Sequence, residues 1–137
     1  MSRSYAQINT DLGGAFGAEP HFADQLTQLD TTSETFATFF SLSEIALPAG
    51  TYRAGIVFQY GASTGSTQGE YRATWNGAIL DVETLQIASA GERKTYANFG
   101  YAVLAAAVYT LNVDIRRSAG AGTFSIDDGH LELWRVA

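Results

Sequence analysis

The feature that most constrains the fold is a strict alternation of apolar and polar side chains in residues 108–117. One face of this segment would carry Tyr109, Leu111, Val113 and Ile115, and the other would carry Thr110, Asn112, Asp114 and Arg116. Successive side chains of a β-strand point to opposite faces of the sheet. The pattern therefore predicts a half-buried strand, and half-buried strands are typical of antiparallel sheets.

The same period of two recurs through most of the chain after residue 35, between segments rich in Gly, Ser and Asn. In residues 51–60 one face is apolar, with Tyr52, Ala54, Ile56, Phe58 and Tyr60. In residues 96–105 one face carries Ala97, Phe99, Tyr101 and Val103. Short alternating strands separated by turns predict an all-β, antiparallel β-sandwich with about eight strands in residues 35–137.

A tight hairpin is predicted at Asn76-Gly77, because this pair readily takes the positive φ values of a type I′ turn. A two-residue loop there sets Trp75 opposite Ala78, Ala73 opposite Leu80 and Tyr71 opposite Val82, so that one face is apolar throughout. On the other face Arg72 would lie opposite Asp81, a favourable pair, and Glu70 opposite Glu83, an unfavourable one.

The closing segment contains a change of phase, because Phe124 and Ile126 are separated from Leu131 and Leu133 by an odd number of residues. A tight turn at Asp128-Gly129 would make a hairpin of this segment. A β-bulge at the same place would keep one long, kinked strand. The preceding ten-residue strand needs a long partner, which favours the bulge, although the pattern leaves both possibilities open.

Residues 1–34 form a separate unit, an arm that is polar and contains glycine, with isolated apolar side chains. These side chains are Tyr5, Ile8, Leu12, Phe16, Phe22, Leu26 and Leu29. The last three follow Pro20 at helical spacing, so the arm is predicted to contain at most one short helix. The arm either caps the core of its own domain or docks on a neighbouring chain, and the sequence does not separate the two.

The run Gly61-Ala62-Ser63-Thr64-Gly65 matches the G-x-S-x-G nucleophile elbow of serine hydrolases, and acidic residues and His130 follow later in the chain. An elbow requires a helix directly after the serine. No helical periodicity follows Gly65, so the stretch from Gly61 to Gly69 is interpreted as a long exposed loop between strands. A hydrolase is therefore the weakest of the functional hypotheses.

A second group, formed by Asp127, Asp128, His130 and Glu132, could be a metal or acid–base site. In a strand, however, Asp128, His130 and Glu132 would share the solvent face, and aspartates beside glycine are common in turns and bulges. With two histidines and no cysteine in the chain, a multi-histidine or thiolate metal site is excluded. We predict no catalytic residue, no metal and no cofactor.

The amino-acid composition limits the kinds of partner that the chain is expected to bind. The formal net charge is −6, and basic residues adjoin only in pairs, such as Arg116-Arg117, so a phosphate-binding surface and a nucleic-acid partner are not expected. The first ten residues contain no apolar signal segment, and no apolar run is long enough to span a membrane, so we expect a protein made in the cytoplasm. Aromatic side chains at strand spacing are usually core, but Trp75, near a hairpin tip, is the best candidate for an exposed sugar platform.

Four stretches together resemble small jelly-roll structural proteins of tailed bacteriophages. They are the run Leu47-Pro-Ala-Gly-Thr-Tyr-Arg, the Asn76-Gly77 hairpin, the strand Val108-Tyr-Thr-Leu-Asn-Val, and the ending Phe-Ser-Ile-Asp-Asp-Gly-His-Leu-Glu-Leu-Trp-Arg-Val. The family includes capsid decoration (cement) proteins and tail or fibre modules. The resemblance covers residues 35–137 and lies in the pattern of strands and turns.

The resemblance implies a non-enzymatic protein of the virion surface, assembled in the cytoplasm of a bacterial host. Its partners would be other capsid or tail proteins and further copies of itself, as a homo-oligomer and possibly a homotrimer. Contacts are expected from Tyr5, Ile8, Leu12, Phe16, Phe22 and Trp75. The alternative hypothesis is a glycan-binding, receptor-recognition sandwich.

Overall fold

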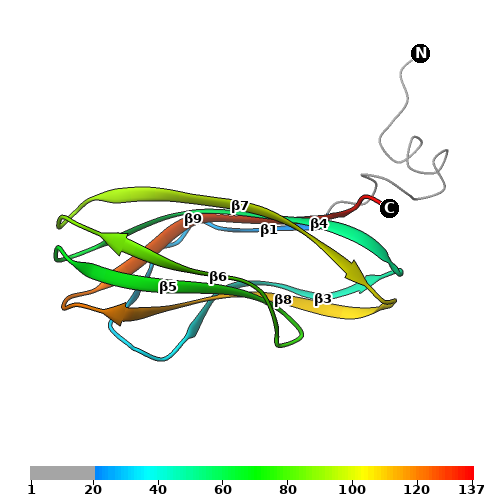
Figure 1. Cartoon of the computed structure of the whole chain (residues 1–137), viewed down its shortest axis with the longest axis horizontal. Coiled ribbons are helices and arrows are strands. Elements are labelled where there is room, and N and C mark those ends of the chain that lie inside the picture. The colour runs from blue at the N-terminus through cyan, green and yellow to red at the C-terminus, as the bar shows by residue number, and fades with distance from the viewer. Residues whose placement is uncertain (1–20) are drawn as a thin grey trace, which may run out of the picture.

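The computed structural model describes residues 21–137, and this part of the chain consists of nine strands in two packed antiparallel sheets, without a helix (Figure 1). Sheet A contains β1 (His21–Gln25), β2 (Leu29–Thr31), β4 (Gly50–Ala62), β7 (Arg93–Leu104) and β9 (Phe124–Arg135). Sheet B contains β3 (Ala37–Leu47), β5 (Thr67–Trp75), β6 (Ala78–Ile87) and β8 (Ala107–Ala119). The predicted all-β sandwich is confirmed.

The strand order is that of a jelly roll. Sheet A runs β1-β9-β4-β7 and sheet B runs β3-β8-β5-β6. The two short strands β1 and β2 pair with successive parts of β9, so they act as two parts of one interrupted strand. When they are counted as one, each sheet has four strands and the sandwich has eight, as in a double Greek key.

The arm, predicted to contain at most one short helix, has none in residues 21–34, because the residues after Pro20 form β1 and β2. Phe22 lies opposite Glu132, and Leu29 lies opposite Ile126. Pairing with β9 gives this segment a ladder of backbone hydrogen bonds, which outweighs a helical spacing of three apolar residues. The sheet thus begins upstream of residue 35, while Tyr5, Ile8, Leu12 and Phe16 lie outside the described residues.

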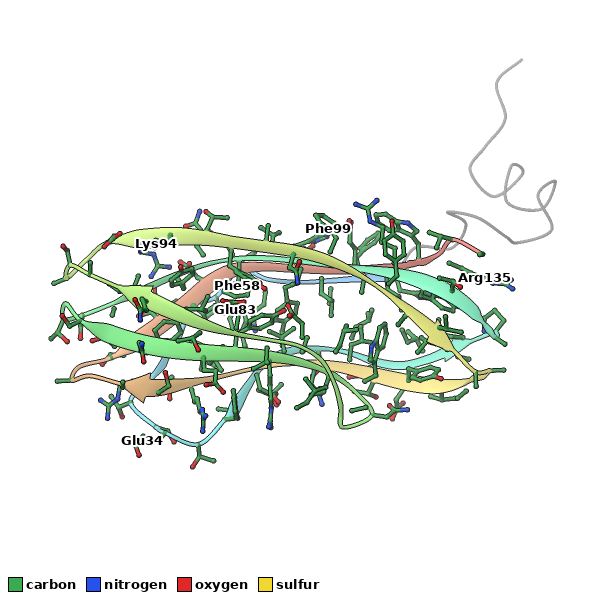
Figure 2. The ribbon with its side chains drawn as sticks, in the orientation of Figure 1. Glu34, Phe58, Glu83, Lys94, Phe99 and Arg135 are labelled. Atoms are coloured by element: carbon green, nitrogen blue, oxygen red, sulfur yellow. The ribbon has the colours of Figure 1, made fainter. Side chains whose placement is uncertain are left out.

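The core lies between the sheets and is built mainly from the alternating strands β4 and β8. Tyr52, Phe58, Val113 and Ile115 are at most 2% exposed, as the alternation predicts. Figure 2 shows Phe58 between the two layers, where its ring lies 5.2 Å from the ring of Tyr71 on sheet B. Each large apolar side chain buried in this way stabilises the fold by about 1.5–3 kcal/mol, so this layer holds the sheets together.

The Asn76-Gly77 hairpin is confirmed, with positive φ at both residues and Trp75 opposite Ala78. The register beyond it differs from the prediction, because a bulge shifts it by one residue between Ala73 and Thr74. Arg72 therefore lies opposite Val82 and forms its ion pair, at 3.0 Å, with Asp114 of β8.

The phase change in the closing segment is absorbed by a bulge, as the length of the preceding strand favours, and β9 continues to Arg135. Val57 of β4 pairs with His130 and Gln59 pairs with Asp127, so two residues of β9 face one of β4. Asp128 takes the left-handed conformation with φ 48°. A Cβ on the following residue, Gly129, would lie 2.7 Å from the Phe39 ring, so this bulge position requires glycine.

Candidate functional site

The G-x-S-x-G stretch is a short, anchored turn and not the long loop expected from the sequence. β4 extends to Ala62 and β5 begins at Thr67, so four residues connect the strands. The Ser63 hydroxyl accepts a hydrogen bond of 2.8 Å from the Thr123 amide, and the Ser63 amide donates to the Thr123 carbonyl. Thr67 fixes the other end of the turn by donating to the Ala121 carbonyl. With a strand following it, Ser63 lacks the geometry of a nucleophile.

His130 is not positioned to activate Ser63. It lies on β9 seven residues beyond Thr123, the partner of Ser63, and this separation is about 23 Å along a strand. The His130 Nδ1 lies 2.5 Å from an Asp24 carboxylate oxygen, and Nε2 lies 3.2 Å from Glu132. The bond to Asp24 raises the pKa of His130, burial opposes this, and Glu132 raises it further. The His130 ring therefore links β1 to β9.

The aspartates of the same segment have structural roles as well. Asp127 forms an ion pair with Arg93 of β7, and Asp128 forms the bulge. Among residues 21–137 no group of three or more potential ligands is arranged to hold a metal ion. The same part of the chain contains no helix that could cross a membrane.

The expectation that Trp75 is exposed is wrong. Its side chain is buried at 6% exposure, and its indole ring packs edge-on against Tyr109 at 6.1 Å. Its position near a hairpin tip did not predict its exposure, because Trp75 is the last residue of β5 and its side chain points between the sheets. A sugar platform at Trp75 is therefore excluded. Phe22, the other described candidate for contacts, is 59% exposed on the outer face of β1.

The outer face of sheet B carries charged side chains that are paired within the chain. Asp114 accepts hydrogen bonds from Thr38 and Arg72, and Arg116 donates to Glu70. The guanidinium groups of Arg72 and Arg116 lie 4.1 and 4.6 Å from the centre of the Phe36 ring. These contacts leave few unsatisfied groups for a partner.

The outer face of sheet A is apolar where it crosses β7. Phe99, Tyr101 and Val103 are 51%, 68% and 84% exposed, and Figure 2 shows Phe99 on the side of β7 away from sheet B. The inward side chains of β7 include Tyr96, which stacks on Phe58 at 5.1 Å. The apolar side chains that alternate along this strand therefore point toward solvent.

Arg53 and Trp134 complete this surface, which we call the outer-face cluster: Arg53, Phe99, Tyr101, Val103 and Trp134. The Arg53 guanidinium lies 4.5 Å from the centre of the Phe99 ring and 5.2 Å from that of Trp134. Neighbouring Gly55 leaves room for Phe99, since a Cβ there would lie 2.4 Å from its ring. Residues 21–137 form no ion pair with Arg53, so within this part of the chain the cluster combines aromatic rings with a cation that contacts them.

A small cavity of about 90 Å³ opens beside the cluster, between β6 and β7, with Asp81 and Asn98 in its wall. One oxygen of the Asp81 carboxylate accepts hydrogen bonds from Tyr71 at 2.5 Å, Asn98 at 2.9 Å and Tyr96 at 3.0 Å. Burial raises the pKa of Asp81, but these hydrogen bonds outweigh it and lower the pKa overall. Asp81 is an anion that links the two sheets.

Sequence reasoning did not identify the outer-face cluster, since alternation cannot tell which face of an edge strand is inside. The sequence did contain one signal, the absence of any charged residue between Lys94 and Asp114. A strand without charged residues is not expected to leave one face in contact with water. A β7 surface without charge is the feature of this sandwich that most closely resembles a contact site.

Solved structures share the fold. The structure of infectious bursal virus-derived T=1 particles gives a TM-score of 0.64 at 9% identity, covering 85% of this chain and 32% of that protein. The infectious bursal disease virus VP2 subviral particle gives a TM-score of 0.62 at 11% identity, covering 84% of this chain and 32% of that protein. The chain therefore spans about a third of the length of these viral proteins. At such identities the likeness establishes a jelly-roll-like fold of the kind found in viral capsid proteins.

The fold also occurs outside viruses. The C-terminal domain of EclA, a sugar-binding protein, gives a TM-score of 0.51 at 15% identity and covers 77% of each chain. No protein-family model matches this sequence, and no curated protein is similar to it at a significant level.

Proposed function

We propose that this chain is a non-enzymatic structural component of a viral particle, acting through protein–protein contacts made by the outer-face cluster. The observation that carries the proposal is the exposure of Phe99, Tyr101 and Val103 on a single strand. Exposed apolar side chains that adjoin one another are typical of interaction sites. Aromatic residues and arginine are also the side chains most enriched among residues that dominate binding energy.

The remaining surface supports a contact role more than a catalytic one. Ser63 and His130 are held by separate partners, and the charges on sheet B are paired within the chain. The viral likeness in fold supports a particle protein as well, although fold alone does not determine function. The finer role is a capsid decoration protein of a tailed bacteriophage, with a tail component as the next candidate. It would be located on the virion surface after assembly in the host cytoplasm.

Residues 1–20 supply further contacts in this proposal, through Tyr5, Ile8, Leu12 and Phe16. A deletion that tests them must end before His21, because β1 and β2 belong to sheet A. The genes beside the coding sequence provide a first test. Capsid or tail genes are expected, whereas a metabolic operon would contradict a virion role.

Binding to purified particles provides the direct test. The whole chain should sediment with particles, and the double variant Tyr101→Ala/Val103→Ala should lose at least tenfold in affinity. Leu26→Ala is the matched control, since Leu26 is 73% exposed near the opposite edge of sheet A. Equal binding by the double variant would exclude the outer-face cluster as the contact.

The second candidate function is glycan binding, and the side-by-side placement of Trp134, Arg53 and Tyr101 favours it. Aromatic rings present apolar faces on which a sugar ring can stack, and arginine supplies several fixed donors. In this case Trp134→Ala should abolish binding on a glycan array. No glycan binding by the whole chain would reject this alternative.

A further inference from the structure

Strand β7 is an edge strand without the usual protection against pairing. Within residues 21–137 it pairs with β4 alone (Figure 1), and the twelve-residue register between them contains no bulge. The ten residues from Thr95 to Leu104 contain no proline and no charged side chain. An edge strand exposes a row of unpaired backbone donors and acceptors, and natural proteins usually blunt it with charges, prolines, bulges or interruptions.

The other three edges of the sandwich carry such devices. The β3 edge has two register shifts, and Glu44 there adopts a positive φ of 55°. The β6 edge carries Asp81 and Glu83, and it has a bulge near its start. The edge formed by β1 and β2 is interrupted between the two strands and carries Asp24 and Asp30. The difference between β7 and these edges indicates that β7 is covered by a partner in the functional state.

We propose that β7 pairs antiparallel with β7 of a second copy of this chain, across a two-fold axis that extends sheet A through both molecules. The two charges at the start of the strand already have partners in their own chain: Arg93 with Asp127, and Lys94 with Glu92 at 3.6 Å. An uncharged strand is therefore matched best by an equally uncharged one, and a two-fold axis supplies it.

Pairing of this kind would also enlarge the surface that faces away from sheet B. In an antiparallel pair with aligned faces, Phe99, Tyr101 and Val103 of both copies lie on the same side of the joined sheet. At their observed exposure, Phe99 and Tyr101 contribute on the order of 250 Å² per chain, and two copies contribute about 500 Å². This area is comparable with the largest apolar patches of monomeric proteins, which are often functional. One copy alone offers about half of it.

The inference deepens the proposed contact role, and its test uses the purified full chain alone, so it can fail while particle binding succeeds. The measurement is the mass in solution by light scattering, across micromolar concentrations. The wild-type chain should form a species of twice 14.7 kDa. The double variant Ala97→Lys/Val103→Lys should dissociate at least tenfold more readily, because it places lysines of the two copies opposite or diagonal to one another on the same face.

The control is Leu26→Lys/Ile79→Lys, which adds the same charge at two exposed apolar positions on other edges. It should remain a dimer. At concentrations low enough for all three proteins to be monomeric, thermal unfolding of both double variants should match the wild type, because all four side chains are exposed and the sheets do not depend on them. A monomeric wild-type chain, a trimer, which a two-fold contact cannot close, or a dimer unaffected by Ala97→Lys/Val103→Lys would each overturn the proposal.

Discussion

Asp81→Ala should weaken the link between the two sheets by a measurable amount. The Asp81 carboxylate on β6 accepts hydrogen bonds from Tyr71 on β5 and from Tyr96 and Asn98 on β7. Tyr71 has no exposed surface, so its hydroxyl would lose its charged acceptor and keep only the neighbouring Tyr96 hydroxyl as a partner. Loss of a buried hydrogen bond to a charged group costs about 1.5–3 kcal/mol. Tyr96 and Asn98 can bond water instead, so the expected total is about 2–4 kcal/mol.

Urea denaturation of a double-mutant cycle with Tyr71→Phe measures this effect. The double variant should be no less stable than Asp81→Ala alone, because the hydroxyl that loses its charged acceptor is then absent. A loss below about 0.5 kcal/mol in Asp81→Ala, or a double variant whose loss equals the sum of the single losses, would refute the reasoning.

The same cycle has a pH dependence with a defined sign. The pKa of Asp81 is lowered in the folded chain, so its stabilising effect is fully present above the ordinary value of 3.8 and is lost as the pH falls through the lowered value. The difference in stability between the wild type and Asp81→Ala should therefore be constant near neutral pH and shrink in acid. A difference that grows in acid would contradict the role of the anion.

Three further predictions concern other parts of the fold. His130→Gln should remove the pH dependence of β1 stability. Because the pKa of His130 is raised in the folded chain, its stabilising effect is complete below the ordinary histidine pKa and is lost as the pH rises through the raised pKa. Hydrogen exchange of the β1 amides measures this loss. Trp75→Ala should destabilise the chain by about 3–5 kcal/mol in urea, whereas an exposed tryptophan would cost little. Ser63→Ala should lower stability by about 0.5–1.5 kcal/mol through the lost bond to Thr123 and leave any esterase background unchanged.

Alternation was sufficient to predict the central strands. In β4 and β8 the apolar face is buried as expected, because both strands have neighbours on each side and one face must meet the opposite sheet. The bulge at Asp128 was also predictable, since an odd spacing between apolar residues must be absorbed locally. The pattern predicts these features because, in the middle of a sheet, every second side chain is buried.

The edges were less predictable. β1 and β2 pair with β9, about a hundred residues away in sequence, and no local pattern indicates such pairing. For β7 the period is correct, but Tyr96 and Asn98 turn inward toward Phe58 and Asp81, so the more apolar face remains outside. Trp75 was misplaced for a related reason, because proximity to a turn does not determine side-chain direction. The outer-face cluster was missed because tertiary contacts determine which face of β7 points into the core.

Hydroxyl-radical footprinting of the chain, free and bound to particles, tests the central claim most directly. Aromatic side chains report their own exposure, and Phe36 on the outer face of sheet B provides an internal control. The account predicts that Phe99, Tyr101 and Trp134 become protected on the particle while Phe36 keeps its reactivity. Protection of Phe36, with Phe99 and Tyr101 unchanged, would place the contact on sheet B and contradict the role of the outer-face cluster.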